Sequence, residues 1–116
     1  MDENVVSVLE NILYYCERIE SFKRTFGNDI EDFLNNDAYN MSCAFSLMQI
    51  GECVKKISQW LCSENNNVEW NKVCRFRDFI AHNYGKVDNV VVWNIIDKHL
   101  PILNNEIKSL LDKYNH

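Results

Sequence analysis

The fold is decided by residues 37–61, which read DAYNMSCAFSLMQIGECVKKISQWL. Apolar residues recur here at intervals of three and four, the spacing that places side chains on one face of an α-helix. We predict one long helix from Asp37, whose carboxylate can cap its start, to Leu61. Gly51 lies in the middle, where glycine costs up to about 1 kcal/mol relative to alanine, so we expect another helix to approach closely there. The predicted apolar face consists of Met41, Ala44, Leu47, Met48, Val54, Ile57 and Leu61.

A first helix is predicted before this stretch, at residues 4–25, because its apolar residues also recur at steps of three and four. Gly27 follows it, as glycine commonly does just past a helix end. Phe33 and Leu34 are the expected anchors of the short acidic stretch that comes next. The stripe of the first helix consists of Val5, Leu9, Ile12, Cys16 and Ile19.

Two more helices are predicted after residue 61. The third spans about residues 68–82, and Asp88 can cap the last one. Pro101 lacks a backbone N–H and falls inside the last apolar pattern, so it should kink or break that helix near residues 98–100. Core candidates of these two helices include Trp70, Val73, Cys74, Ile80, Ala81, Val91, Val92, Ile95, Ile96, Leu100, Leu103, Ile107, Leu110 and Leu111.

Composition agrees with a small helical domain. The chain has 116 residues, of which 47% are apolar and 25% are charged, so it can bury a core and is not disordered. It contains only three glycines and one proline, too few for the many turns of an all-β protein. We therefore expect one all-α domain over residues 1–116, a bundle of four to five helices.

The charge and the cysteines exclude several classes of protein. A net charge of −5 argues against binding nucleic acid with the whole surface, although a local basic cleft is compatible with it. No apolar run is long enough to span a membrane, and no signal peptide opens the chain. The five cysteines have no pair at the spacing of a zinc or thioredoxin motif, so we expect reduced, buried thiols in a cytosolic protein.

The chemistry is concentrated in residues 70–86, WNKVCRFRDFIAHNYGK, which hold four basic residues and one acid. Within it, His82 can move protons near neutral pH, and the guanidinium of Arg77 suits a phosphate. Tyr84 adds a hydroxyl and a ring. These residue types together are suited to phosphodiester chemistry, whereas the chain has no phosphate-binding glycine loop, serine triad or zinc-protease motif.

The spacing of Arg77 and His82 leaves two interpretations open. The residues are five apart, so on an ideal helix they point about 140° away from each other. They can converge at the end of a helix or across the twofold axis of a dimer. Alternatively, Arg77 pairs with an acidic residue and His82 caps a helix end, as a cation is favoured there.

The motif and its surroundings resemble the HEPN superfamily, and within it the HepT-like branch of small toxins. The motif is an arginine, four residues and a histidine, with a polar residue after the arginine and Asn83–Tyr84 after the histidine. The resemblance covers nearly the whole chain. It includes Ile19–Glu20, Ile50–Gly51–Glu52, Trp70, Gly85–Lys86–Val87–Asp88, Val92–Trp93 and Leu100–Pro101.

This resemblance implies a homodimeric helical bundle that cleaves RNA without a metal or cofactor, with Arg77 and His82 as the catalytic pair in the dimer cleft. It implies a partner, a minimal nucleotidyltransferase antitoxin, which transfers AMP to Tyr84 and so blocks RNA access. The products would be a 2′,3′-cyclic phosphate and a 5′-hydroxyl.

Other residues are expected to support this site. Asp78 lies one turn before His82, and Glu52 is expected either in the site or, more simply, as an ion-pair partner that orients Arg75 or Arg77. The remaining RNA-binding candidates are the basic residues Lys72, Arg75 and Lys86. The rival hypothesis is a non-catalytic helical module that docks a nucleotidyltransferase and presents its substrate.

Overall fold

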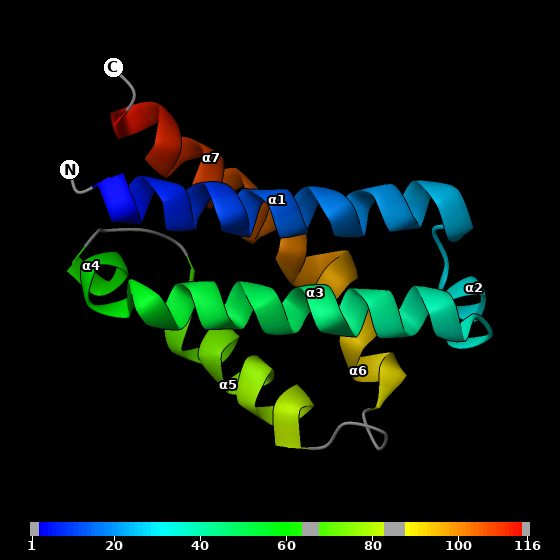
Figure 1. Cartoon of the computed structure of the whole chain (residues 1–116). Helices are drawn as coiled ribbons and strands as arrows, with labels where there is room; N and C mark the ends of the chain where they lie inside the picture. Colours follow the sequence, from blue (N-terminus) through cyan, green and yellow to red (C-terminus); the bar gives the residue numbers. More distant parts are fainter. Residues whose placement is uncertain (1–2, 64–67, 83–87, 115–116) are drawn as a thin grey trace.

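A computed structural model describes residues 3–63, 68–82 and 88–114, and all regular structure in these ranges is helical. The long helices α1 and α3 run antiparallel side by side (Figure 1). α5 packs against α3, and α7 packs against α1. The elements are α1 (Glu3–Phe26), α2 (Ile30–Leu34), α3 (Asp37–Lys56), α4 (Ser58–Ser63), α5 (Trp70–His82), α6 (Asn89–Asn94), the π-helical turn η1 (Ile95–His99) and α7 (Leu100–Tyr114).

The predicted all-α architecture is confirmed, but the long central helix is shorter than expected. α3 ends at Lys56, because Ile57 adopts φ −120° and ψ 21°, and the separate short helix α4 follows. The helix is capped by Asn36 rather than Asp37: the Asn36 side-chain oxygen accepts a hydrogen bond from the backbone N–H of Tyr39 at 3.1 Å. Both residues have cap-forming side chains, so their neighbouring positions compete for the role.

The core lies between α1, α3, α5 and α7, and it buries the predicted stripe of α1 together with Phe33. Three predicted apolar positions instead face outward: Leu34, Met41 and Val91 are 38%, 51% and 39% exposed. Most of the predicted α3 face is buried, including Ala44, Leu47 and Val54, but Met41 lies outside the row of residues that meets the core. That buried row includes Cys43, Leu47, Ile50 and Val54.

The cysteines that the structure describes fit the sequence-based expectation. Cys16, Cys43 and Cys53 are buried thiols, and Cys74 is half-buried. Burial raises the pKa of both Cys16 and Cys43 to about 12, because the thiolate would lose its hydration in the core. These two thiols therefore remain protonated and serve as packing groups.

Pro101 alters the last helix without breaking it. The chain continues from α6 through η1 into α7, and the backbone N–H of Leu100 bonds to the carbonyl of Ile95, five residues back. A proline ring clashes with the carbonyl four residues before it, here that of Asp97. The π turn widens the helix at the place where the sequence predicted a kink, so a break is not needed. None of the helices in the described ranges is long and apolar enough to cross a membrane.

Gly51 explains how α5 can lie so close to α3. A side-chain methyl at Gly51 would overlap the β- and γ-carbons of Arg77. The close approach expected from the sequence is therefore confirmed, and the helix that makes it is the one that carries the proposed motif.

We predict that Gly51→Ala lowers the free energy of unfolding by about 1–2 kcal/mol, although alanine normally stabilises a helix interior relative to glycine. The reason is overlap with the Arg77 stem. Urea titration of the variant against wild type measures the change. Ser42→Ala, a half-buried position on the same helix, is the control and should leave stability unchanged or slightly raised. A stabilised Gly51→Ala would contradict the close packing.

Candidate functional site

Arg77 is the centre of a small charged cluster between α3 and α5. The stem of Arg77, on α5, packs on Gly51 of α3. Its Nε pairs with the carboxylate of Glu52, the next residue of α3. Its Nη1 donates a hydrogen bond to Asp78 Oδ1 at 2.8 Å. The Arg77 side chain is only 26% exposed. The guanidinium is therefore fixed from two sides, and the rest of its N–H donors remain for an anion.

The two carboxylates also keep Arg77 charged. Its pKa is raised, chiefly by the hydrogen bond to Asp78; burial opposes this rise, and the charges of Glu52 and Asp78 add to it. The cluster contains one positive and two negative groups, so its own charge sums to −1. A phosphate bound here consequently needs further positive charge from neighbouring residues.

The two interpretations of the motif can now be separated in part. Arg77 does pair with acidic residues, and Glu52 takes the orienting role that the sequence favoured. That pairing is compatible with a catalytic role, because the carboxylates orient the guanidinium while it keeps its charge. His82 is the last residue of α5, one turn beyond Asp78. The side chain of His82 lies outside the described part of the structure, as do Tyr84 and Lys86.

The other predicted RNA-binding residues lie around α5. Arg75 is exposed. Lys72 forms an ion pair with Glu69 at 3.1 Å and lines a separate, mostly apolar cavity of about 450 Å³ with His99. Lys72 precedes Arg77 by five residues, so the two side chains lie about 140° apart around α5. The structure therefore groups Glu52, Arg77 and Asp78 and places Lys72 apart from them.

An aromatic groove between α1 and α3 was missed by the sequence analysis. It has a volume of about 370 Å³. The guanidinium of Arg18 lies 5.8 Å from the centre of the Tyr14 ring, a cation–π contact. A second apolar row in the sequence of α3, at Met41, Phe45 and Met48, could have predicted this groove. Glu52 follows on the same row, since the four positions are separated by four, three and four residues. The groove is lined by Tyr14, Tyr15, Arg18, Phe22, Met41, Ser42, Phe45 and Ser46.

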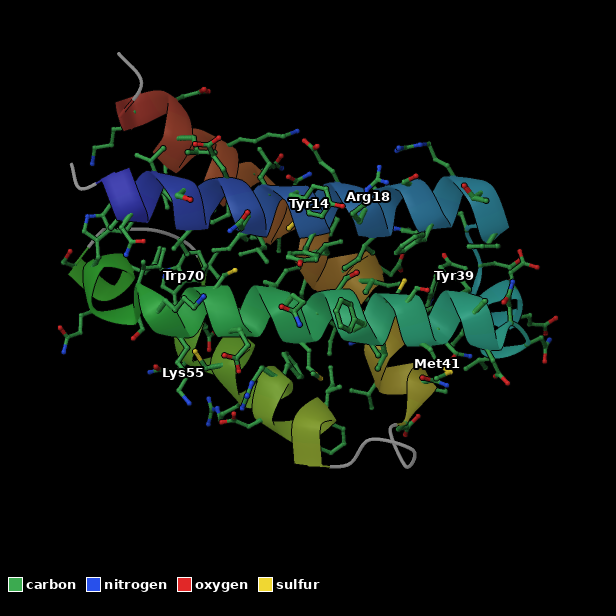
Figure 2. All side chains as sticks on the ribbon, viewed as in Figure 1. Tyr14, Arg18, Tyr39, Met41, Lys55 and Trp70 are labelled. Carbon is green, nitrogen blue, oxygen red and sulfur yellow. The ribbon has the colours of Figure 1, made fainter. Side chains whose placement is uncertain are left out.

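Figure 2 shows how these features are distributed along α3. Met41 is near the start of the helix and Lys55 is in its last turn. Glu52 lies between them, nearer the basic end. The outward face of α3 thus changes from apolar, through the Arg77 cluster, to basic.

Comparison with known proteins identifies the family. Residues 12–110 match the family model described as Ribonuclease HepT-like. A "Putative RNase" of Caldanaerobacter subterraneus subsp. tengcongensis is 31% identical over 105 residues, covering 90% of this chain and 92% of the relative. A "Probable ribonuclease HepT" of Thermococcus cleftensis is 30% identical over 102 residues, covering 88% and 91%.

A further "Putative RNase", from Methanocaldococcus jannaschii, is 28% identical over 108 residues, covering 93% of this chain and 91% of the relative. No solved structure matches the chain at a significant level. The family match spans the central helices, the Arg77 cluster and the motif of α5. The chain belongs to the HepT-like ribonuclease family.

Proposed function

We propose that this protein is the toxin of a toxin–antitoxin pair and acts in the cytoplasm as a metal-independent endoribonuclease. The observation that carries the proposal is the state of Arg77: it is charged, clamped by Glu52 and Asp78, and placed five residues before the histidine that ends α5. Membership of the HepT-like ribonuclease family supports RNA as the substrate.

In this mechanism the attacking group belongs to the RNA itself. His82 accepts the proton of the ribose 2′-hydroxyl while the bond from O2′ to phosphorus forms. The bond from phosphorus to O5′ breaks, and the leaving oxygen takes a proton from an imidazolium or from water. Arg77 stabilises the charge that develops on the phosphate. The products are a 2′,3′-cyclic phosphate and a 5′-hydroxyl, and no step requires a metal.

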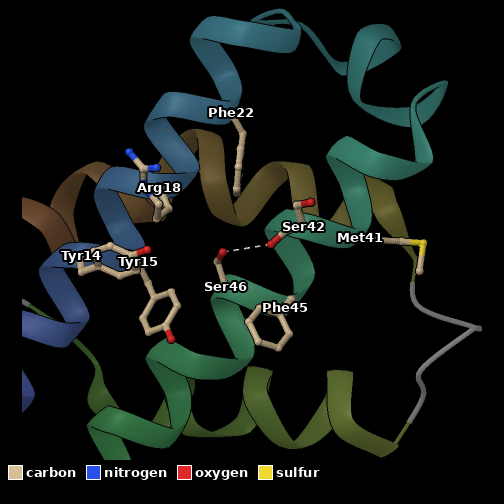
Figure 3. Close-up of a pocket in the computed structure, with 8 residues that line it drawn as sticks. All are labelled: Tyr14, Tyr15, Arg18, Phe22, Met41, Ser42, Phe45 and Ser46. Carbon is tan, nitrogen blue, oxygen red and sulfur yellow. Dashed lines mark hydrogen bonds between the residues drawn. The ribbon is translucent and has the colours of Figure 1, made fainter.

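The active form is proposed to be a homodimer whose interface includes the apolar first half of the outward face of α3, at Met41 and Phe45, and the groove beside it. Figure 3 shows Tyr14, Phe45 and Met41 around this groove. These three side chains, one on α1 and two on α3, are 55%, 52% and 51% exposed, and all three line the same groove. The apolar row continues into Glu52, which holds Arg77. A second copy on this face would therefore bring two Arg77 clusters to one interface.

The proposed antitoxin is a nucleotidyltransferase that transfers AMP to Tyr84. Tyr84 follows His82 by two residues in a segment that also holds Lys86. An added phosphate beside the motif would compete with the RNA phosphate for Arg77. Because Tyr84 is assigned no part in proton transfer, its phenol should be dispensable for cleavage.

Catalysis can be tested with purified protein and a single-stranded RNA in the presence of EDTA. We expect cleavage by wild type and a loss of at least about 100-fold in Arg77→Ala and in His82→Ala, since each removes a transition-state or proton-transfer group. Arg24→Ala and His99→Ala, which change the same residue types at exposed positions elsewhere, are the controls and should cleave normally. Undiminished cleavage by either motif variant would assign the activity to another site.

The interface can be tested by light scattering at micromolar concentration. Wild type should have twice the chain mass of 13.7 kDa, and Phe45→Glu should be monomeric because it places a charge in the apolar face. The matched control is Ile102→Glu, since Ile102 on α7 is exposed to nearly the same extent, 51%. If wild type is a monomer, two copies cannot share a site. If Phe45→Glu is still a dimer, the interface lies on another face.

The role of Tyr84 can be tested by incubating the protein with ATP and a nucleotidyltransferase encoded beside its gene, the proposed antitoxin. Intact mass should rise by one or more AMP groups in wild type and in Tyr14→Phe, which removes an exposed phenol elsewhere. Tyr84→Phe should gain no mass, keep its cleavage activity and resist neutralisation. If Tyr84→Phe is neutralised as well as wild type, the antitoxin acts by another route, such as covering the site.

A further inference from the structure

The Arg77 cluster needs additional positive charge before it can hold a phosphate. Its one cation is accompanied by two carboxylates, and the whole chain carries a net charge of −5. RNA presents one negative charge per nucleotide, so binding depends on lysines and arginines placed along its path.

The nearest basic residues on the same helix are Lys55 and Lys56 in the last turn of α3. They follow Glu52 by three and four residues, so they lie one turn along the helix. Viewed along the helix axis, Lys55 lies about 60° to one side of Glu52 and Lys56 lies about 40° to the other side. Both are exposed. The two lysines therefore lie on either side of the position of Glu52 around the helix, one turn further along α3.

The same two lysines line a polar pocket of about 420 Å³, which we call the Lys55–Trp60 pocket. It lies between the first turn of α1, the end of α3 and the helix α4. The described residues that line it include no acidic side chain, in a chain where acids outnumber bases. Trp60 is one of the lining residues, and it is half-buried because it also packs against the core. The lining consists of Asn4, Val5, Lys55, Lys56, Ile57, Ser58, Gln59 and Trp60.

This combination of groups fits one nucleotide of a single strand. Lysine ammonium groups bind phosphate as point charges, and an indole face stacks on a base whatever its identity. One helical turn, about 5.4 Å along the axis, separates the lysines from Glu52.

We propose that the Lys55–Trp60 pocket is an RNA subsite that binds the nucleotide next to the scissile phosphate, with Lys55 and Lys56 on the backbone and Trp60 on the base. The proposal rests on the ribonuclease function proposed above and adds the residues that hold the substrate beside the catalytic pair. It also gives the lysines a role beyond offsetting the dipole at the end of α3.

The proposal can be tested by fluorescence anisotropy with a labelled RNA oligonucleotide that carries 2′-O-methyl groups and cannot be cleaved. Affinity is measured over a range of salt concentrations for wild type and for the double variant Lys55→Gln/Lys56→Gln. We expect weaker binding and a decrease of about 1.4 in the salt slope, because each phosphate contact on a single strand contributes about 0.7. The control is Lys98→Gln/Lys108→Gln, which changes the net charge equally at exposed positions outside the pocket.

The stacking contact is tested separately. Trp60→Leu should weaken binding about tenfold with an unchanged salt slope, whereas Trp60→Phe keeps a ring and should bind close to wild type. Because Trp60 also packs on the core, urea titration of both variants checks that they are folded. Equal binding by folded Trp60→Leu and wild type would overturn the stacking assignment.

The outcomes separate this subsite from the ribonuclease function. If wild type cleaves RNA and the lysine double variant matches its control in affinity and salt slope, the subsite is wrong and the ribonuclease stands. If wild type neither binds nor cleaves RNA, both proposals fail. If the double variant loses RNA affinity and salt slope while its control keeps both, the lysines contact the polynucleotide backbone, as proposed.

Discussion

The stem of Arg77 packs directly on the backbone of Gly51, and its guanidinium is bound by the next residue, Glu52. This one contact fixes the distance between α3 and α5, the orientation of the guanidinium and the direction in which α5 carries the motif towards His82. Any side chain at position 51 would separate the two helices. Gly51 and Arg77 therefore form a single structural feature.

The contact also sets the electrostatics of the site. Glu52 and Asp78 hold Arg77 in place and raise its pKa, but they leave the cluster with one more negative than positive charge. A cluster with this charge orients a phosphate but attracts it only weakly. Further cations are needed to raise its affinity for a phosphate. In an acidic protein, the proposed binding of RNA therefore depends on the few surfaces where basic residues gather.

The outward face of α3 connects the parts of the proposed enzyme. Its first half is apolar at Met41 and Phe45, its middle holds Glu52, and its last turn carries Lys55 and Lys56. One helix would thus serve self-association, orientation of Arg77 and substrate binding in succession. Its opposite face is continuous with the core, so the position of each function along the helix is fixed by packing.

The sequence by itself determined the helical class, the stripe of α1, the cap at Asp88 and the reason for Gly51, since each depends on local periodicity or backbone chemistry. It also singled out Arg77 and Glu52. Only the tertiary structure decided that Glu52 pairs with Arg77 and that Met41 faces outward, because α3 carries two apolar rows and periodicity alone does not say which one meets α1. The π turn before Pro101 was likewise decided by packing, which keeps α6 and α7 continuous where the backbone rule predicts a kink.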